Sequence, residues 1–483
     1  MDTTILGSVS FQGTERTPPA RRRRDGHRER YLFLVLEGAR LEAGGLRVAL
    51  EGVEVLRIGR GEARALILAN DRTQALEVPD SQMSAAHARI LRAGASLVLE
   101  DAGSMNGTLV NGEPVATHPL RDGDLVELGQ TVFLYREIEE AAAGRAPGLD
   151  ASAAAARGPG FATLDPNLAR RLDRLARVAP SPLSILLLGE TGTGKEVLAR
   201  GLHGLSQRPG PFVALNCGAV PQNLVESHLF GHVRGAFSGA LKDEPGLVRA
   251  AQYGTLLLDE IGDLPVGSQA ALLRVLQESE VQPVGSTQAA KVDVRIIAAT
   301  HMPLEDLVER GAFRRDLYAR LAGYTFTLPP LRERVVDLGL LVALLLSAGK
   351  LGRHDVRIRT DAARAMVRHD WPMNVRELEK CLGAACVLAD DGVITAEDLP
   401  PGFAASLELD GAPGSDGAPL AGAGAAPGDA SAAADADQRT VLVALLAEHG
   451  GNLSAVARAM RTSRSHVHRL MKRYGIEGKP VSG

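Results

Sequence analysis

Two short segments near the middle of the chain carry residues that could bind a nucleotide and cleave it. The first, GETGTGKE, stands between the apolar run SILLL and a helix-like stretch. Backbone N–H groups of such a glycine loop can surround phosphate oxygens, and a lysine adds positive charge for the outer phosphates. We therefore expect an ATP-binding loop formed by Gly189, Glu190, Thr191, Gly192, Thr193, Gly194, Lys195 and Glu196.

The second segment, GTLLLDEIGDLP, reads as a buried strand that ends in two carboxylates. We expect Asp259 to hold Mg²⁺ through water and Glu260 to act as the general base that polarises the attacking water. A third strand, VRIIAAT, is expected to end beside them in the same sheet. Together the two segments predict hydrolysis of ATP.

Three arginines could complete this chemistry. In FRRDLYARL, Arg314 and Arg320 suit arginine fingers that reach the γ-phosphate of a neighbouring subunit. The alternative is that they are surface arginines paired with Glu309 or Asp316. In WPMNVRELEK, Arg376 would lie on a lid helix, where it could sense the nucleotide.

The sequence patterns around these residues predict a chain of several domains. Short apolar runs alternating with Gly, Asn and Asp turns are typical of an all-β sandwich. Alternating strand-like and helix-like segments then predict an α/β unit with a helical lid. The expected boundaries are 1–28 for a disordered basic tail, 29–138 for the sandwich, 139–160 for a linker, 161–400 for the α/β unit with its lid at about 335–400, 401–436 for a second linker and 437–478 for a small all-α unit.

Three polar residues fall in turns of the expected sandwich. Arg60, Ser84 and Asn106 offer a basic side chain, a hydroxyl and an amide. Converging at one end of the sandwich, they would suit a phosphate group. The alternative is that they are ordinary turn residues.

The last part of the chain indicates a DNA-binding unit. The stretch GNLSAVARAMRTSRSHVHRLMKRYGI contains no Asp or Glu, and its apolar residues have helical spacing. This pattern predicts a helix-turn-helix with a basic recognition helix. We expect base contacts from Ser465, His466, His468 and Arg469, and phosphate contacts from Arg464, Lys472 and Arg473.

Composition narrows the class of protein. The net charge of −4 over 483 residues excludes general electrostatic binding of nucleic acid by the whole molecule. The three cysteines, an odd number at no metal-ligand spacing, favour a reducing compartment. No apolar run approaches the roughly 20 residues of a membrane span. We therefore expect a cytoplasmic protein with no membrane partner.

The middle of the chain resembles the bacterial enhancer-binding activators of sigma-54 RNA polymerase, which are AAA+ ATPases. The strings that carry this resemblance include GETGTGKE, LNCGAV, LFGHVRGAFSGA, GTLLLDEIGDL, LPPLRER and WPMNVREL. The resemblance implies that glutamate is the usual residue at position 196. It also implies that Asn216 holds Glu260 in a switch tied to the nucleotide. His301 stands where the family usually has asparagine.

The same resemblance gives a role to the glycine-rich string GAFSGA. In the family this loop rises when ATP is bound and contacts the sigma factor. Its glycines give the backbone freedom, and the aromatic tip could bury on a partner. An aromatic side chain folded back on the protein is the alternative. The implied sigma contacts are Gly235, Ala236, Phe237, Ser238, Gly239 and Ala240.

The two ends of the chain resemble other known domains. The ordered set G-R, S-x-x-H and S-x-N-G-T is similar to forkhead-associated (FHA) domains, which bind phosphothreonine peptides. That resemblance assigns Arg60 and Ser84 to the phosphate and Asn106 to the peptide backbone. The C-terminal stretch resembles the Fis-type helix-turn-helix of enhancer-binding activators.

These patterns together predict a sigma-54-dependent transcription regulator. It would bind upstream DNA, hydrolyse ATP with Mg²⁺ as an oligomer between dimer and hexamer, and act on the sigma-54 RNA polymerase holoenzyme. A phosphothreonine protein or a Ser/Thr kinase would control it through the FHA domain. The rival predictions are a protein-remodelling ATPase of the chaperone type and a DNA-binding scaffold with a weakened ATPase.

Overall fold

The computed structural model describes residues 28–70, 72–139, 148–353 and 355–403, and a few single positions between 443 and 471. The chain divides into two units, 1–412 and 413–483, and only those single positions are described in the second. Residues 1–27 of the predicted tail (1–28) and most of the linker at 401–436 therefore lie outside the described residues. The same holds for the predicted helix-turn-helix at 437–478, apart from those single positions. The DNA contacts predicted at Arg464, Ser465, His466, His468, Arg469, Lys472 and Arg473 also lie outside the described residues.

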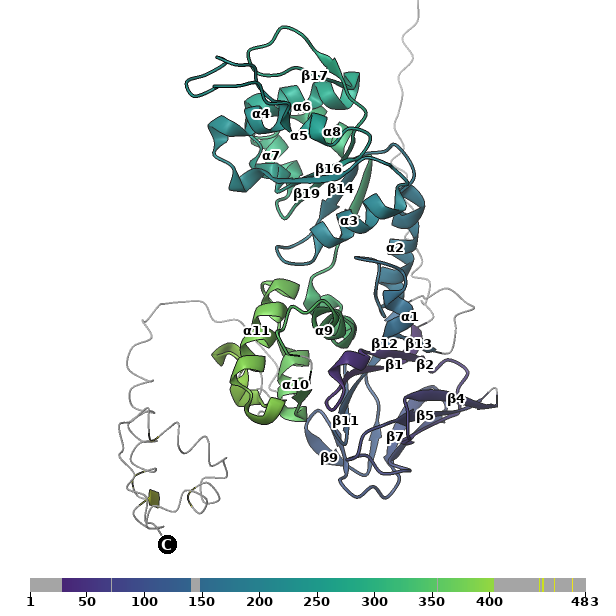
Figure 1. The fold of residues 1–483 in the computed structure, drawn as a ribbon. Coiled ribbons are helices and arrows are strands. Elements are labelled where there is room, and N and C mark those ends of the chain that lie inside the picture. Colours follow the sequence, from purple (N-terminus) through teal and green to yellow (C-terminus); the bar gives the residue numbers. More distant parts are fainter. Residues whose placement is uncertain are drawn as a thin grey trace, which may run out of the picture. The chain divides into compact units, whose positions relative to one another are not determined.

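The N-terminal part forms two β-sheets, as the turn-rich sequence predicts (Figure 1). One has the strand order β13-β2-β1-β12-β11-β8-β9, and the other has the order β10-β7-β6-β3-β5-β4. We refer to residues 28–139 as the β domain. The strands are β1 (Arg28–Glu37), β2 (Leu46–Ala49), β3 (Val55–Arg60), β4 (Ala65–Asn70), β5 (Thr73–Val78), β6 (Ala88–Ala93), β7 (Ser96–Asp101), β8 (Thr108–Val110), β9 (Glu113–Val115), β10 (Thr117–Pro119), β11 (Leu125–Leu128), β12 (Thr131–Glu139) and β13 (Gly148–Asp150).

Strand β1 is buried on both faces, which explains why its sequence YLFLVLE is continuously apolar. Successive side chains of a strand point to opposite faces of the sheet. Leu32 and Leu34 belong to the core between the two β-sheets. Tyr31, Phe33 and Val35 belong instead to a core shared with helices near the C-terminal end of the first unit. The outer face of β1 is therefore covered by protein rather than by solvent.

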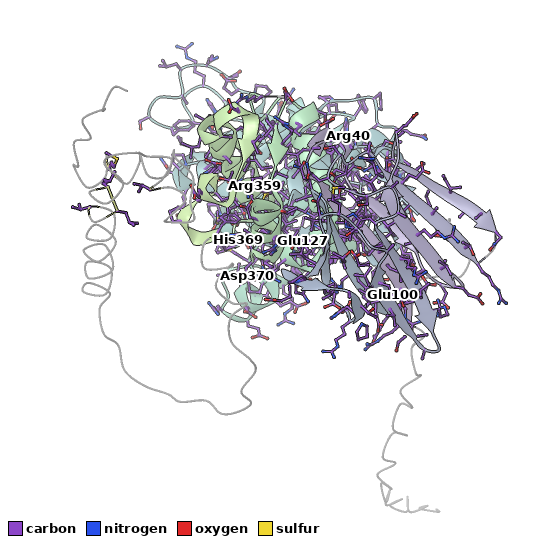
Figure 2. All side chains as sticks on the ribbon, turned by 90° about the horizontal axis from the view of Figure 1, so that it is seen from below. Arg40, Glu100, Glu127, Arg359, His369 and Asp370 are labelled. Atoms are coloured by element: carbon purple, nitrogen blue, oxygen red, sulfur yellow. The ribbon has the colours of Figure 1, made fainter. Side chains whose placement is uncertain are left out.

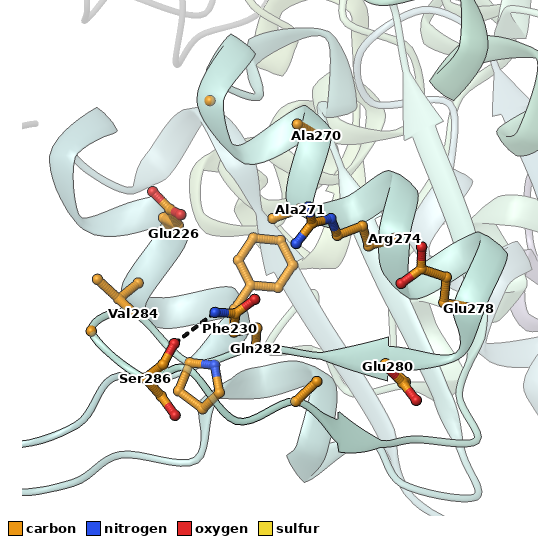
Figure 3. A pocket seen from close by; sticks show the side chains of 14 residues that line it. Glu226, Phe230, Ala270, Ala271, Arg274, Glu278, Glu280, Gln282, Val284 and Ser286 are labelled. Atoms are coloured by element: carbon orange, nitrogen blue, oxygen red, sulfur yellow. Dashed lines mark hydrogen bonds between the residues drawn. The ribbon is translucent and has the colours of Figure 1, made fainter.

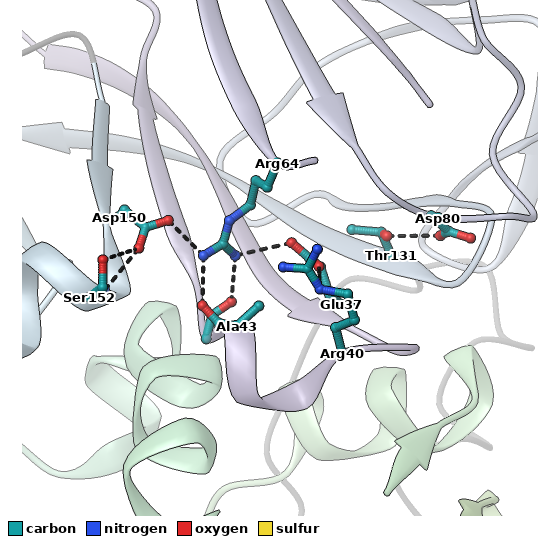
Figure 4. Close-up of polar contacts among 9 residues, drawn as sticks. Glu37, Arg40, Ala43, Arg64, Asp80, Thr131, Asp150 and Ser152 are labelled. Atoms are coloured by element: carbon teal, nitrogen blue, oxygen red, sulfur yellow. Dashed lines mark hydrogen bonds and ion pairs between the residues drawn. The ribbon is translucent and has the colours of Figure 1, made fainter. Parts of the chain in front are cut away.

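The second half of the segment predicted to be a linker extends the β domain. Strand β13 pairs with β2, and helix α1 (Ala151–Ala155) follows it directly. Arg64 holds this strand in place, because its guanidinium binds the carboxylates of Asp150 and Glu37 (Figure 4). The Ala-rich composition of the segment gave no indication of this strand.

The α/β unit contains a five-stranded parallel sheet with the order β15-β16-β19-β14-β20. All its strands run the same way, so their carboxyl ends meet at one edge. Its elements are α2 (Pro166–Val178), β14 (Ile185–Leu188), α3 (Lys195–Leu205), β15 (Phe212–Asn216), η2 (Cys217–Ala219), α4 (Gln222–Phe230), α5 (Gly246–Ala250), β16 (Thr255–Asp259), η3 (Ile261–Asp263), α6 (Val266–Glu278), β17 (Glu280–Val281), β18 (Ala290–Lys291), β19 (Arg295–Thr300), α7 (Leu304–Glu309), α8 (Arg315–Leu321) and β20 (Tyr324–Thr327).

A helical lid, residues 331–403, follows the sheet. Its longest helix is amphipathic, with Leu378, Leu382 and Ala385 buried at helical spacing. Trp371 is fully buried in the lid core and packs edge-on against Phe403. The lid elements are η4 (Leu331–Glu333), η5 (Val335–Asp337), α9 (Leu338–Ser347), β21 (Arg357–Ile358), α10 (Thr360–Arg368), α11 (Asn374–Leu388), η6 (Asp390–Gly392), β22 (Val393–Ile394), η7 (Ala396–Asp398) and η8 (Pro401–Phe403).

The lid packs against the outer face of the β domain. The carboxylate of Glu127 accepts two hydrogen bonds from the Arg364 guanidinium, at 2.6 and 2.7 Å (Figure 2 labels Glu127). The Glu127 side chain is only 2% exposed, and the Arg364 guanidinium is its cationic partner. The backbone N–H of Ile358 also donates to the carbonyl of Gly38 at 2.7 Å. An apolar core, a buried ion pair and a backbone bond thus join the two parts.

We expect Arg364→Ala to destabilise the protein, because it leaves the Glu127 carboxylate buried without its cation. Breaking a buried pair from one side typically costs about 3–5 kcal/mol of unfolding free energy. Urea denaturation of the full chain measures the change. Arg359→Ala is the matched control, since Arg359 is an exposed arginine of the same lid. Equal stability of the two variants would contradict a structural role for the Glu127–Arg364 pair.

Candidate functional site

The predicted phosphate loop, residues 189–196, joins strand β14 to helix α3. Gly192 and Gly194 have φ values of 79° and 103°, in the left-handed region that glycine tolerates best. Lys195 is 6% exposed, and its Nζ donates to the carbonyls of Gly189 and Glu190 at 2.9 and 3.2 Å. Burial lowers the pKa of Lys195, while the nearby carboxylates of Glu260 and Asp259 oppose that shift. A buried ammonium group thus lies beside two acids.

The two acids stand at the end of β16, as predicted. Burial and the neighbouring Glu260 raise the pKa of Asp259, and Lys195 opposes this change. Glu260 has φ 49°, a backbone region that is unusual for a side chain other than glycine. Its Oε2 lies 2.7 Å from Nδ1 of His301, the residue that follows β19. The general-base candidate is therefore held by a ring nitrogen at the end of the adjacent strand.

One pocket of about 670 Å³ brings most of the predicted nucleotide residues together. Its walls come from the phosphate loop, the carboxyl ends of β15 and β16, the lid helices α9 and α11, and the segment after α1. The predicted residues that line it are Thr191, Gly192, Gly194, Lys195, Glu196, Asn216, Asp259, Glu260 and Arg376. Gly189, Glu190 and Thr193 belong to the same loop but do not line the pocket. The Thr193 hydroxyl donates to the Glu190 carbonyl, and the Glu190 carboxylate binds Arg332.

Asn216 lies in the pocket, but its amide has a different partner from the one that the resemblance implies. Its Oδ1 accepts hydrogen bonds from the backbone N–H groups of Gly218 and Ala219, at 3.0 and 3.1 Å. It thereby caps η2, the 3-10 turn that leads toward α4. The Asn216–Glu260 switch stays a prediction. The sequence gave no partner for Glu260 at His301, although the end of strand VRIIAAT placed the residue nearby.

The carboxylates at the end of β16 fit a magnesium ion. Carboxylate oxygens are suitable ligands for Mg²⁺, which usually takes only one or two of them together with phosphate and water. Asp259 can supply one such ligand, and Glu260 remains available as the base. Glu196 is not such a ligand, since its carboxylate pairs with Arg200 at 2.7 Å. Within residues 28–70, 72–139, 148–353 and 355–403, no cluster of three or more metal-ligating side chains was found.

The two predicted arginine fingers lie outside this pocket. Arg314 precedes α8, and its guanidinium binds the Asp316 carboxylate at 2.7 and 3.0 Å. Arg320 lies in the last turn of the same helix and is exposed. The pairing of Arg314 with Asp316 is the alternative that the sequence left open. A role at a neighbouring subunit's nucleotide stays a prediction.

The GAFSGA loop, residues 235–240, has a fixed base and an exposed tip. The backbones of His232 and Glu244 exchange two hydrogen bonds at 3.0 and 2.9 Å, which close the base. Phe237 is 38% exposed, and its ring lies 5.0 Å from the His232 ring. Leu241 next to the loop is 84% exposed. The tip therefore offers apolar surface, although Phe237 is partly covered by His232.

A second pocket of about 420 Å³ lies beside the loop base (Figure 3). Phe230, the last residue of α4, and Val284 both line it. The N–H of Val233 donates to the Val284 carbonyl at 3.1 Å, and the N–H of Val284 donates to the Gly231 carbonyl at 2.9 Å. The loop base and the segment after β17 are thus joined in one structure.

In the β domain, the three predicted phosphate-binding residues lie at the end of β3 and in two turns, and these segments are hydrogen-bonded to one another. The N–H of Arg60 donates to the Ser84 carbonyl at 2.9 Å. The Ser84 hydroxyl accepts from the N–H of Met105 at 3.0 Å, and the amide of Asn106 donates to the Gln82 carbonyl at 2.7 Å. The side chains of Arg60 and Asn106 are exposed.

None of the helices in the described part of the chain is long and apolar enough to cross a membrane.

Comparison with known families identifies three domains in the chain. Residues 162–327 match the model of the sigma-54 interaction domain, and residues 332–413 match that of the AAA+ ATPase lid domain. Residues 56–129 match the FHA domain. The chain therefore contains an FHA domain and an AAA+ sigma-54 interaction domain with its lid, as predicted.

The chain is similar to known transcription regulators. It is 46% identical over 319 residues to the acetoin catabolism regulatory protein of Cupriavidus necator, covering 65% of this chain and 46% of that protein. It is 47% identical over 238 residues to the sigma54-dependent transcriptional activator SfnR of Pseudomonas putida, covering 49% and 65%. The chain thus spans less than two thirds of these relatives.

A solved structure shows a partial likeness. The crystal structure of NtrX from Brucella abortus in complex with ADP is 30% identical, with a TM-score of 0.48, covering 65% of this chain and 69% of that chain.

We expect Glu260→Gln to bind ATP and to hydrolyse it far more slowly, because the amide cannot accept the proton of the attacking water. Loss of a general base typically lowers the rate about 10²–10⁴-fold. Steady-state phosphate release measures the rate, and a fluorescent ATP analogue measures binding. Glu309→Gln is the matched control, since Glu309 is an exposed glutamate on α7. Turnover by Glu260→Gln within a few-fold of the control would show that another residue is the base.

Proposed function

We propose that this protein is a sigma-54-dependent transcriptional activator that hydrolyses ATP and remodels the closed promoter complex through its GAFSGA loop. The pocket that unites Lys195 with Asp259 and Glu260 is the observation that carries the proposal. It supplies a cation for phosphates, a metal-binding acid and a base at one sheet edge. The match to the sigma-54 interaction domain supports the choice of partner.

In this proposal each residue of the pocket has one chemical task. Lys195 stabilises the negative charge of the outer phosphates, and Glu260 accepts the proton of the attacking water. Mg²⁺ bound at Asp259 would neutralise charge that develops on the transferred phosphoryl group. His301 restrains the Glu260 carboxylate, so the base must leave or share that contact when it orients water.

A change in the bound nucleotide would be transmitted to the GAFSGA loop through the elements that lie between the pocket and the loop. Asn216 lines the pocket and also caps η2. Helix α4 follows η2 and ends at Phe230, one residue before the loop base begins at Gly231. A change at Asn216 on hydrolysis can therefore shift α4 and raise or lower the tip that carries Phe237.

Control by a phosphothreonine protein or a Ser/Thr kinase is part of the proposal. The FHA match and the exposed Arg60 and Asn106 side chains support recognition of a phosphopeptide. The packing of the β domain on the lid, through the Glu127–Arg364 pair and the shared apolar core, offers a route from that peptide to the ATPase.

DNA binding by residues 437–478 and assembly into dimers and hexamers complete the proposal. They rest on the basic sequence of residues 451–476, which contains no Asp or Glu, and on Arg314 and Arg320. A chaperone-type remodelling ATPase should lack the basic C-terminal helices. A non-catalytic DNA-binding scaffold would not need Lys195 and Glu260 in one pocket.

We expect Phe237→Ala to keep ATP hydrolysis and DNA binding but to lose open-complex formation. Phe237 lies outside the nucleotide pocket, and its ring is the aromatic tip of the loop. Purified protein, sigma-54 holoenzyme, promoter DNA and ATP in one reaction allow all three outputs to be measured.

Leu241→Ala is the matched control for Phe237→Ala, because it removes another exposed apolar side chain next to the loop. Open complexes at the wild-type rate with Phe237→Ala would remove this residue from the sigma contact. A parallel fall in hydrolysis and opening would favour a structural role against His232.

We expect Arg60→Ala to abolish preference for phosphothreonine peptides without unfolding the β domain. A charge-assisted hydrogen bond is worth about 1.5–3 kcal/mol, which is at least a tenfold loss of affinity. Titration of phosphorylated and unphosphorylated peptide libraries against the full chain measures the preference. Arg72→Ala is the control, since Arg72 is an exposed arginine paired with Glu54. If wild-type protein binds both libraries equally, the domain does not read phosphate.

A further inference from the structure

The outer side of the phosphate loop is bonded to the lid at four consecutive residues. The Glu190 carboxylate accepts hydrogen bonds from the Arg332 guanidinium at 2.9 and 2.5 Å, and from the amide of Asn374 at 3.1 Å. The next three bonds involve backbone carbonyls: Thr191 accepts from the Asn374 amide at 3.1 Å, Gly192 from the N–H of Val375 at 3.0 Å, and Thr193 from the Arg334 guanidinium at 2.7 Å.

We propose that Glu190, Arg332 and Asn374 form a latch that positions the phosphate loop against the first turn of α11. Glu190 is then a positioning residue, and its carboxylate serves the protein rather than the nucleotide. This inference rests on the proposed function only in taking the pocket to be a nucleotide site. The sequence placed Glu190 in the loop but gave no partner for it.

Asn374 is the centre of the latch. It is fully buried, and its Oδ1 accepts the N–H of Leu331 at 2.7 Å while its Nδ2 serves Glu190 and Thr191. One amide thus joins the phosphate loop, η4 and the start of α11. Its φ of 57° is unusual for asparagine outside turns, and these bonds offset the strain.

The latch also sets the place of Arg376, which lines the nucleotide pocket two residues after Asn374. Gly192 allows the close approach, because a Cβ atom there would collide with the Met373 carbonyl. The phosphate loop and Arg376 would therefore shift together when the lid shifts. A lid that moves on hydrolysis must move the loop or break the latch.

The charge of the latch is stable at working pH. Hydrogen bonds from Arg332 and Asn374 lower the pKa of Glu190 to about 2. The carboxylate is thus ionised near neutral pH, and the Arg332 pair keeps its charge-assisted character. Both side chains are 41% exposed, so we expect the pair to have a moderate effect on binding and a small effect on stability.

A double-mutant cycle on the full chain tests the latch. Arg332→Ala and Glu190→Gln should each raise the Kd for a fluorescent ATP analogue about fivefold, with kcat within about twofold of wild type. Since both remove the same contact, the double variant should also show about a fivefold change. Independent effects would multiply to about 25-fold. Arg332→Lys, which keeps the charge but loses the paired geometry, should lie between wild type and Arg332→Ala.

Glu333→Ala is the matched control, because Glu333 is an exposed neighbour of Arg332 in η4. Wild-type Kd in both single variants, or multiplied effects in the double variant, would overturn the latch. Nucleotide binding is measured without polymerase or promoter DNA. If wild-type protein forms no open complexes, the proposed function is wrong. The latch would still be tested, because the double-mutant cycle measures only nucleotide binding.

Discussion

The turn at residues 371–374 is the constraint on which the nucleotide site depends. Trp371 and Asn374 both have positive φ values, which L-residues other than glycine adopt at a cost. The turn is held because the Trp371 ring is fully buried and its N–H donates to the Met366 carbonyl at 3.0 Å. Asn374 is held by its bonds to the phosphate loop. The lid core and the nucleotide loop thus determine each other's position.

The lid is packed on two sides, and this arrangement would let it transmit the proposed control by the β domain. Its core includes Tyr31 and Phe33 of the β domain, and the buried Glu127–Arg364 pair adds a charged contact. The first turn of α11 contacts the phosphate loop. A ligand of the β domain can influence hydrolysis only through a difference in its affinity for two lid positions. The shared core couples the position of the β domain to that of the lid, because separating them would expose apolar surface to water.

Sequence reasoning predicted the parts of the site that follow from local pattern. Lys195 after a glycine loop and Asp259 at the end of an apolar strand lie in one pocket, because parallel strands bring their carboxyl ends together. It could not predict the partners of Glu190 or Glu260, since Arg332 and His301 are distant in sequence. Strand β13 was missed because its pairing depends on Arg64 and Asp150. The YLFLVLE run was assigned to the sandwich, but only the structure showed what covers its second face.

The contact between Arg314 and Asp316 bears on how a ring could form. Both side chains are exposed, and an exposed ion pair contributes little to stability because water and salt compete with it. The guanidinium can therefore leave Asp316 at small cost when a stronger anion is offered. A neighbour's triphosphate is such an anion, since it carries more charge and more acceptor oxygens than one carboxylate. In the proposed ring, the surface pair and the arginine finger would thus be successive states of the one Arg314 side chain.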